Sequence, residues 1–460
     1  MIQLGRRLEL FVDHFLIDRM DGARLRLHHP VPREAVLRFD KPWEGPFCGY
    51  PTVFQDGEIC RLYYRGWPSA EKDSPAFYCY AESRDGIRWQ RPALGLHEFQ
   101  GSRDNNIILT GDGTHAFSPF IDARPGVPAG QRYKALGNAR RGQTRGLLAF
   151  ASADGVRFSL MQDELVMTKG AFDSQNLAFW SQSELCYVAY YRVFSESKDW
   201  GEFKGKRTIA RAVSDDFLHW SDPVRMDFGD TPMEHLYTNQ TLPYFRAPHI
   251  YIALPKRFVP GRRTLSDEQI EQFQLEPRQA TAVSEGVFMT SRGGNRYDRT
   301  FMEGFFRPGL DQANWSARNC LSAWGIVQTG AAEMSLYYQQ HYAQPTAFLL
   351  RTTLRLDGFS SVSAGCAGGE MLTRPFTFEG SRLALNVSTS AAGSVRVEVR
   401  DEGGRPLPGL ALDDCDEIWG DQIERVVSWR GNSDVAALAD RGVRLRFALK
   451  DADLYALRFS

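Results

Sequence analysis

Three acidic residues, Asp173, Glu234 and Glu44, are the best candidates for catalytic groups in this chain. Each stands shortly before a segment that we predict to be a β-strand, where a carboxylate can face a shared channel. Two such carboxylates can cleave a glycosidic bond: one donates a proton to the leaving oxygen, and the other attacks the sugar carbon or activates a water molecule. A third can tune the pKa of the acid by like-charge repulsion. The simpler alternative is that these side chains cap turns or pair with Arg and Lys.

The surrounding residues suit a hydroxylated ligand. Trp43 and Trp315 can stack on the apolar face of a sugar ring. Carboxylates, amides, imidazoles and a guanidinium can bind hydroxyl groups, and the predicted binding residues are Asp40, Trp43, His115, Asp122, Gln175, His235, Tyr237, Asn239, Trp315, Arg318 and Asn319. Asp40 also competes with Glu44 for the role of the first carboxylate. We therefore predict a carbohydrate-binding site.

Most of these residues come from five stretches that lie far apart in the chain: 39–50, 114–118, 171–176, 233–240 and 314–319. Each stretch leads into a predicted strand. They can form one site only if the fold brings the starts of five strands to the same place. The prediction of a single site therefore depends on the fold of the segments between the five stretches.

An internal repeat supplies such a fold. The pattern Ser-x-Asp-Gly-x-x-aromatic follows a β-rich segment at 83–89 and at 152–158, and modified copies occur at 214–220 and 291–297. A weak fifth copy without the serine lies at 357–359. Asp-Gly between alternating apolar residues is typical of a tight hairpin turn, because these residues accept a positive φ. Each copy is therefore interpreted as a hairpin.

A second hairpin precedes each copy, the clearest running from 52–54 to 61–64. Two hairpins per unit make a four-stranded sheet, and five units fit residues 35 to 355. Four-stranded sheets repeated around an axis form a β-propeller. We predict an all-β protein in which a five-bladed β-propeller over residues 1–360 is followed by a β-sandwich over residues 361–460.

The predicted sandwich consists of short strands, which include 382–387, 395–399, 443–449 and 454–459. Helix signals are rare, and the best is a capped segment at 265–274 inside the fourth unit.

Composition excludes several classes of protein. The 460 residues include 55 Lys+Arg and 56 Asp+Glu, a net charge of −1, which gives no reason to expect a nucleic-acid partner or an anionic membrane. Hydrophobic residues make up 43% and charged residues 24%, as in folded soluble proteins. No apolar run approaches the roughly 18 residues that span a bilayer. Aromatic residues reach 12%, which is high and fits β-rich folds and ring-stacking sites.

We expect no cofactor and name no metal ligands, and the sequence leaves open whether an ion such as Ca²⁺ occupies the central channel. The seven cysteines are scattered without a CxxC pair, and no Gly-rich phosphate loop leads from a strand into a helix. The first apolar stretch is too short for a signal peptide, so we expect reduced thiols and a cytoplasmic location. The basic run 256–263 is interpreted as a solvated loop.

The arrangement of five blades, inner-loop carboxylates in blades one, three and four, and a trailing sandwich resembles glycoside hydrolase families 32, 43 and 68. The sandwich makes it most similar to family 32, which cleaves fructans and sucrose. The family motifs Asn-Asp-Pro, Arg-Asp-Pro and Glu-Cys correspond here to Gly49-Tyr50-Pro51, to Phe117-Ser118-Pro119 and to Glu234 followed by His. The resemblance implies that Glu234 is the general acid and that Asp173 modulates its pKa.

The resulting hypothesis is a glycoside hydrolase that cleaves small oligosaccharides, with the sugar, the linkage and the stereochemical outcome left open. One alternative is a glycoside phosphorylase on the same fold, with Arg318 and His235 as basic residues beside the acid. Another is a non-catalytic carbohydrate-binding propeller with fewer than two carboxylates within about 10 Å of each other. A sialidase is less favoured because no arginine cluster for a sugar carboxylate is apparent.

Overall fold

The computed structural model describes residues 1–69 and 74–460 and is all-β, as the sequence predicts. Within these residues helix is limited to α1 (Asp267–Gln272) and to four 3-10 turns, η1 (Ala129–Gln131), η2 (Pro277–Thr281), η3 (Gln312–Asn314) and η4 (Ala436–Leu438). The helix α1 begins at a capping box formed by Ser266 and Gln269, inside the segment predicted to be helical. None of the helices in the described part is long and apolar enough to cross a membrane.

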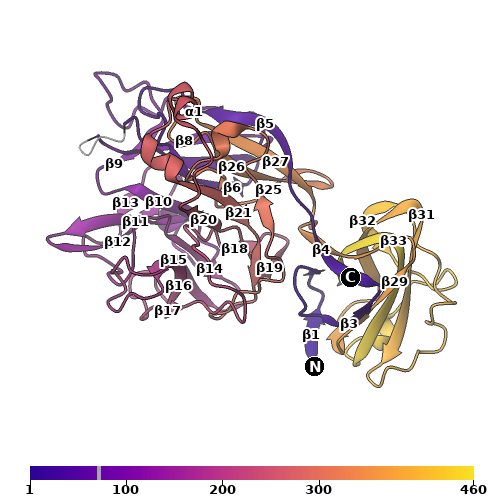
Figure 1. Ribbon diagram of the computed structural model, residues 1–460. Coiled ribbons are helices and arrows are strands. Elements are labelled where there is room, and N and C mark those ends of the chain that lie inside the picture. Colours follow the sequence, from indigo (N-terminus) through magenta and orange to yellow (C-terminus); the bar gives the residue numbers. More distant parts are fainter. Residues whose placement is uncertain (70–73) are drawn as a thin grey trace. The chain divides into compact units, whose positions relative to one another are not determined.

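The chain divides into two compact units (Figure 1). Unit 1 consists of Met1–His29, Ala331–Glu333 and Leu354–Ser460, and unit 2 consists of Pro30–Gly330 and Met334–Thr353.

Unit 2 begins with three antiparallel sheets, each made of four consecutive strands. The first sheet contains β6 (Gly49–Asp56), β7 (Ile59–Gly66), β8 (Phe77–Ser83) and β9 (Ile107–Thr110). The second contains β10 (Gly113–Ile121), β11 (Tyr133–Arg141), β12 (Thr144–Ser152) and β13 (Ser159–Leu160). The third contains β14 (Leu177–Ser181), β15 (Cys186–Phe194), β16 (Arg207–Ser214) and β17 (Val224–Arg225).

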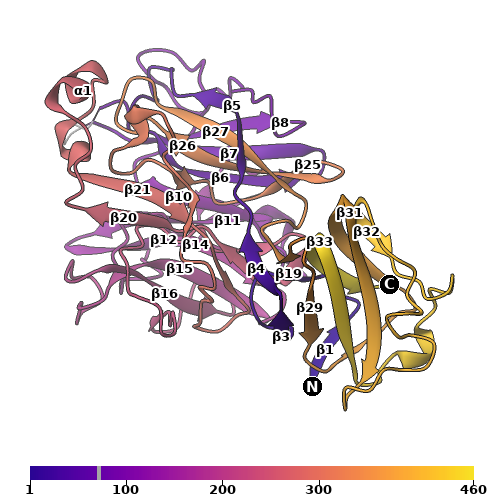
Figure 2. The same ribbon diagram turned by 45° about the vertical axis from the view of Figure 1, so that its right-hand side comes forward.

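The fourth region of unit 2 is one long hairpin that is interrupted in the middle. It forms two three-stranded sheets: β18 (Leu242–Tyr244), β19 (Ala247–Ala253) and β22 (Met289–Ser291), then β20 (Lys256–Pro260), β21 (Ala282–Val287) and β23 (Gly304–Phe306). The register continues without a slip across the break, from Ala253 opposite Met289 to Lys256 opposite Gly286. Pro255 lies at the break, where its missing N–H prevents continuous pairing. Figure 2 shows β20 and β21 side by side.

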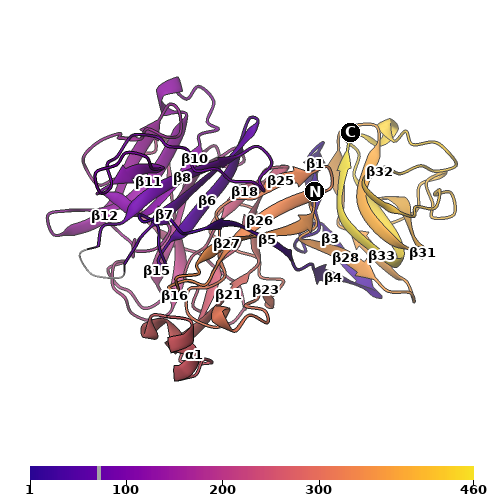
Figure 3. The ribbon, with the colours of Figure 1, turned by 90° about the horizontal axis from the view of Figure 1, so that it is seen from above.

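The last sheet of unit 2 is completed by a strand from much earlier in the chain. It contains β24 (Leu321–Ser322), β25 (Val327–Gly330), β26 (Glu333–Gln340), β27 (Phe348–Arg355) and, beside β27, the strand β5 (Val31–Arg38) (Figure 3). In register, Phe348 lies opposite Arg38 and Thr353 lies opposite Val31. The edge of β27 is thereby covered.

With the fourth hairpin counted once, unit 2 has five successive sheets, and hydrogen bonds link each to the next. Side-chain bonds that do so are Tyr63 to Gly155, Tyr187 to Asp122, Tyr251 to Ser181 and Trp324 to Thr241. The fifth sheet also meets the first, since the backbone N–H of Val53 donates to the carbonyl of Trp324 at 2.8 Å. The five sheets therefore form a closed series of contacts.

The predicted repeat turns share one hydrogen-bond pattern. In the first copy the Ser83 hydroxyl accepts from the N–H of Gly86 at 2.9 Å, and Asp85 accepts from the N–H of Arg88 at 2.8 Å. The same bonds recur in the copies at 152–158 and 214–220. In the third copy Phe217 replaces the glycine and still adopts a φ of 73°. In the degraded copy at 291–297, the Ser291 hydroxyl donates instead to the carbonyl of Gly293.

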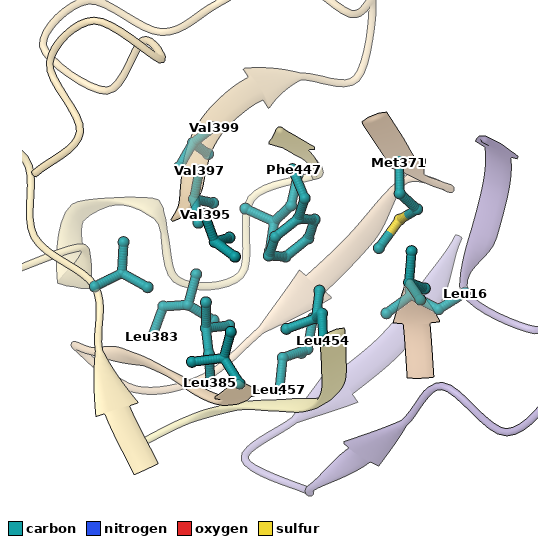
Figure 4. Close-up of a cluster of buried hydrophobic side chains, with 14 of the residues drawn as sticks. Leu16, Met371, Leu383, Leu385, Val395, Val397, Val399, Phe447, Leu454 and Leu457 are labelled. Carbon is teal, nitrogen blue, oxygen red and sulfur yellow. The ribbon is translucent and has the colours of Figure 1, made fainter. Parts of the chain in front are cut away.

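Unit 1 is a single network of ten paired strands. They are β1 (Ile2–Gly5), β2 (Glu9–Leu10), β3 (Ile17–Asp21), β4 (Ala23–Leu27), β28 (Ser360–Ala364), β29 (Gly369–Thr373), β30 (Phe376–Phe378), β31 (Leu383–Asp401), β32 (Asp421–Val426) and β33 (Val443–Phe459). The predicted short strands 382–387 and 395–399 are two parts of β31, and 443–449 and 454–459 are two parts of β33. Figure 4 shows Leu383 and Leu385 facing Val395 and Val397 across the core.

The first 29 residues belong to unit 1, whereas the sequence prediction assigned residues 1–360 to one domain. The strand β4 pairs along its length with β28, and β1 pairs with β30. Such pairing between chain ends leaves no local signal, because the repeat search sees only neighbours in sequence. The weak fifth repeat copy, Asp357-Gly358-Phe359, also lies in unit 1 and leads into β28.

Candidate functional site

Residues from all five predicted inner segments meet around Tyr237. The Tyr237 hydroxyl lies 3.3 Å from that of Tyr50, and Tyr50 also donates to the backbone carbonyl of Asp173 at 3.3 Å. His115 packs edge-on against Tyr50 with 6.0 Å between ring centroids. The guanidinium carbon of Arg318 lies 5.6 Å from the centroid of the Tyr237 ring. The structure therefore brings together Asp173, His115, Tyr237 and Arg318, which sequence reasoning placed in four separate loops.

Four more cationic side chains surround the two tyrosines. Lys256, Arg192 and Arg207 lie 4.6, 5.3 and 5.7 Å from the centroid of the Tyr237 ring, measured from the ammonium nitrogen or the guanidinium carbon. Arg65 lies 4.7 Å from the centroid of the Tyr50 ring. These four residues and Arg318 are called the cationic cluster below.

Two members of the cationic cluster come from middle strands that sequence reasoning did not consider. Arg65 lies near the end of β7, opposite Gly49 at the start of β6, and Arg192 lies near the end of β15. A middle strand runs antiparallel to the innermost strand, so its end lies beside the inner loop. The triplet Tyr-Tyr-Arg, at 63–65 and again at 190–192, is the signal that could have identified both arginines.

A third member, Lys256, begins the basic run that was expected to be a solvated loop. That expectation is wrong, because Lys256–Pro260 is the strand β20 and Lys256 is only 1% exposed. Alternate residues of a strand point to opposite faces. Lys256 accordingly faces Tyr237, while Arg257 pairs with Glu234 and Glu285.

Asp173 is the carboxylate of the cationic cluster. Its side chain is 45% exposed and forms an ion pair with Arg192. Within residues 1–69 and 74–460, no other carboxylate is ion-paired with the cluster. The remaining cations bond to neutral groups: Arg65 donates to the carbonyl of Phe47 at 2.9 Å, and Lys256 donates to that of Arg318 at 3.2 Å. The site therefore carries excess positive charge.

This excess charge changes the titration of its neighbours. Burial opposes ionisation of Tyr237, but Arg318, Arg192 and the bond with Tyr50 outweigh it and lower the pKa of the phenol to about 8. Burial, followed by Arg65, Arg318 and Arg192, lowers the pKa of His115 to about 3, so this imidazole is neutral at physiological pH. Burial and then Arg318 hold the pKa of Lys256 well below its ordinary value.

The backbone around the site adopts a conformation that costs energy. Tyr50, Gln240 and Arg318 have φ values of 51°, 49° and 64°, in the left-handed region that non-glycine residues rarely occupy. Such conformations persist only where surrounding contacts enforce them, and they are concentrated at functional sites.

Three predicted ligand-binding amides, Gln175, Asn239 and Asn319, serve instead to hold the inner loops together, and all are at most 1% exposed. Gln175 donates to the Thr52 hydroxyl at 3.2 Å and accepts from Gln240 at 2.8 Å. Asn239 caps its own turn by accepting from the N–H two residues on, and Asn319 accepts from the N–H of Tyr342 at 2.8 Å.

Glu234 lies in an arginine clamp. Its two carboxylate oxygens accept from Arg257 at 2.9 Å and from Arg299 at 2.7 Å, and its side chain is 24% exposed. Two guanidinium groups therefore donate to one carboxylate. The neighbouring His235 approaches the guanidinium of Arg207, 3.4 Å from Nδ1, and so borders the cationic cluster.

The predicted site residues of the first inner segment, Asp40, Trp43 and Glu44, are engaged in ion pairs and hydrogen bonds of their own. Glu44 is fully buried; its carboxylate accepts from the Tyr64 hydroxyl at 2.5 Å and pairs with Arg91, and burial raises its pKa despite that arginine. Asp40 is exposed and pairs with Arg91 at 3.4 Å. The indole of Trp43 donates to Asn106 at 2.7 Å.

Asp122 belongs to a link between sheets. It is buried, pairs with Lys134 at 2.7 Å and accepts from the Tyr187 hydroxyl at 2.5 Å. The same carboxylate–tyrosine link recurs from Asp56 to Tyr133 and from Glu184 to Tyr251. Its recurrence between successive sheets indicates a structural role.

Trp315 is half-buried and tied to its own loop, since its indole donates to the carbonyl of Gly309 at 2.9 Å. In the part of the chain that the structure describes, no group of three or more His, Cys, Asp and Glu side chains is arranged to hold a metal ion.

No protein-family model and no curated protein matches the chain. Several solved structures are distantly similar. One described as a glycoside hydrolase is 10% identical, with a TM-score of 0.46, and the match covers 71% of this chain and 92% of the other.

Another is an N-acetylgalactosamine deacetylase from F. plautii in complex with blood group B trisaccharide, 11% identical with a TM-score of 0.46, covering 73% and 96%. A third solved structure carries the description "The GH130 family of mannoside phosphorylases contains glycoside hydrolases that target beta-1,2 mannosidic linkages in Candida mannan". It is 14% identical with a TM-score of 0.39, covering 75% and 94%. None of the three is described as a member of families 32, 43 or 68. Likenesses this distant assign neither a family nor an activity to the chain.

Proposed function

We propose that this protein is an enzyme that cleaves glycosidic bonds in small oligosaccharides, and that Asp173 is its catalytic carboxylate. The observation that carries the proposal is the half-exposed carboxylate of Asp173, which Arg192 holds where all five inner segments converge. We also propose that the five sheets of unit 2 are the blades of a propeller, with this site at one mouth of its channel.

The chemistry follows from the charge of Asp173. An ionised carboxylate at this position can attack a sugar carbon or remove a proton from an attacking water molecule, while the leaving oxygen takes up a proton from water. His115, His235 and Arg318 are half-buried within or at the border of the cationic cluster and offer hydrogen-bond partners for sugar hydroxyl groups.

The proposal changes the role that sequence reasoning gave to Glu234. A general acid must carry a proton, whereas both oxygens of Glu234 already accept hydrogen bonds from arginines. Glu234 fits better as an anchor for Arg257, the residue next to Lys256 on β20.

The free thiols of all seven cysteines fit a reducing compartment, and we propose the cytoplasm.

The experiment that tests the function is a screen of purified protein against aryl glycosides and short oligosaccharides, neutral and acidic. Release of the aryl group or of a shorter sugar by the wild type, and its loss in Asp173→Asn, supports the proposal. Turnover of a substrate at an undiminished rate by Asp173→Asn would remove Asp173 from the mechanism.

A further inference from the structure

We infer that the cationic cluster binds an oxyanion, a phosphate, sulfate or carboxylate group, as part of the ligand of this site. The inference rests on the proposed function, because it names the chemistry of the ligand that the same site would bind. It is carried by the charge balance, the unused donors and the rigidity of the cluster.

The charge balance is the first observation. Arg192, Arg207 and Arg318 place their guanidinium carbons within 5.7 Å of the centroid of the Tyr237 ring, the Lys256 nitrogen lies 4.6 Å from it, and Asp173 is the single carboxylate ion-paired with them in the described part of the chain. Buried charges are ordinarily paired with opposite charge. A ligand that brings negative charge would complete the pairing.

Unused hydrogen-bond donors are the second observation. The Nε–H groups of Arg65 and Arg207 are buried, and neither has an acceptor among the residues that the structure describes. Arg65 is only 3% exposed. An acceptor brought by a ligand could satisfy the Nε–H group of Arg207, the more accessible of the two arginines.

Access is provided by a different set of residues. Arg207, Arg318 and His115 are half-buried, whereas Arg65 and Lys256 lie behind them and are almost fully buried. An incoming anion would therefore contact the guanidinium groups of Arg207 and Arg318, and the buried guanidinium of Arg65 would add to the field. Guanidinium groups suit such ligands because they bind two oxygens at once.

The rigidity of the cluster is the third observation. Arg318 is fixed in a left-handed conformation, its carbonyl accepts from Lys256, and its guanidinium donates to the Tyr342 hydroxyl at 3.3 Å. Pre-organised cations lose little freedom when an anion binds, which favours affinity.

Two sources can supply the oxyanion. Inorganic phosphate would act as the attacking group in a phosphorolysis, in which an oxygen of hydrogen phosphate bonds to the sugar carbon, the glycosidic C–O bond breaks and the leaving oxygen takes up the proton of the hydrogen phosphate. Alternatively, the sugar itself carries a carboxylate or sulfate group. Both sources place an oxyanion on the cationic cluster. They differ in the compound that should bind by itself, which is free phosphate in the first case and an acidic sugar in the second.

The test measures binding without turnover. Calorimetric titrations of wild-type protein use phosphate, sulfate and glucuronate, with glucose as the neutral control, in sodium chloride of matched ionic strength. The variant is Arg207→Met, which removes one unpaired cation and is expected to fold because it relieves repulsion among like charges. The matched control is Arg296→Met, an exposed arginine paired with Asp227 outside the cluster.

We expect at least one of the three anions to bind the wild type and Arg296→Met alike, and to bind Arg207→Met at least tenfold more weakly. Binding of phosphate or sulfate alone indicates a free anion, and binding of glucuronate alone indicates an acidic sugar. Absence of binding by all three, or equal binding by Arg207→Met and the wild type, overturns the inference. If the protein cleaves glycosides but binds none of the anions, only the inference of an oxyanion site is wrong. If it binds anions but cleaves no glycoside, only the proposed function is wrong.

Discussion

The two ends of the innermost strands of unit 2 have opposite chemistry. At their starts lie Asp173 and the cationic cluster, with strained backbone and excess charge. At their other ends lies a cavity of about 810 Å³, lined largely by apolar and aromatic side chains such as Phe54, Phe120, Phe179 and Trp324. The same strands therefore present one end that requires a polar partner and one end that does not.

The contrast between the two ends shows that the volume of a cavity is a poor guide to the functional site of this protein. By volume and apolar lining, the cavity would be the default candidate for a binding pocket. An apolar cavity can nevertheless remain empty at modest cost, whereas buried charge without a counter-charge is expensive. The charged end is therefore the better functional candidate, and the following predictions test that ranking.

The largest expected effect is on catalysis by Asp173. Replacing it with asparagine keeps the shape but removes the charge, and general-base or nucleophilic carboxylates contribute about 10²–10⁴-fold to a rate. We expect a loss of that size in the turnover of whichever glycoside the wild type cleaves. Asp222→Asn is the control, since Asp222 is an exposed carboxylate paired with Lys169 at 2.5 Å. A similar loss in both variants would mean that the effect is not specific to the site.

The second effect is on the titration of Tyr237. Its folded pKa of about 8 lies below the ordinary value of about 10. A lowered pKa of an acid contributes stability that is fully present above pH 10 and is lost as the pH falls through 8. The free energy of unfolding of the wild type, relative to Tyr237→Phe, should therefore increase by about 2 kcal/mol between pH 8 and pH 10.

Denaturant unfolding of both proteins at several pH values measures this difference. The tyrosinate absorbance of the native wild type should also rise with a midpoint near pH 8, and this step should be missing in Tyr237→Phe. If the difference in the free energy of unfolding between the two proteins did not change with pH, the cations would not act on Tyr237.

The third effect separates Glu234 from Asp173. Glu234→Gln loses charge-assisted bonds with Arg257 and Arg299, so we expect a loss of about 1.5–3 kcal/mol in the free energy of unfolding. Turnover at a temperature where the variant is folded should stay within a few fold of the wild type. A loss of turnover by 100-fold or more would restore Glu234 as the general acid that the family resemblance implies.

The smallest effect is expected at the apolar end. Phe245 lines the cavity, is 45% exposed and packs against Tyr244 at 4.8 Å between ring centroids. Phe245→Ala should leave the turnover of the oligosaccharide substrate within twofold, because the reaction takes place at the other end of the strands. A tenfold or greater loss in a folded Phe245→Ala protein would place the substrate in the cavity.

The sequence was informative where the fold is local and repeated. The Ser-x-Asp-Gly turns form as predicted, since each is closed by bonds between residues three apart, such as Ser83 and Gly86. The inner segments that contain His115, Asp173, Tyr237 and Arg318 also meet, because the start of each innermost strand is defined by the hairpin that follows it.

Sequence reasoning failed where a residue's neighbours come from distant strands. Arg65 and Arg192 lie inside regular strands, where an arginine ordinarily points to solvent, and only the antiparallel return of the middle strand brings them to the site. Glu44 looked accessible in a polar loop, yet it is enclosed by Tyr64 and Arg91. The strand β4 likewise finds its partner β28 more than 300 residues later.

The pairing of β5 with β27 has a consequence for biosynthesis. During translation β5 emerges first, and its partner is made about 300 residues later. At the usual 5–20 residues per second, the ribosome needs about 15–60 s to reach it. Throughout that interval Val31–Arg38 is an unpaired strand, open to chaperones and to the same segment of neighbouring nascent chains.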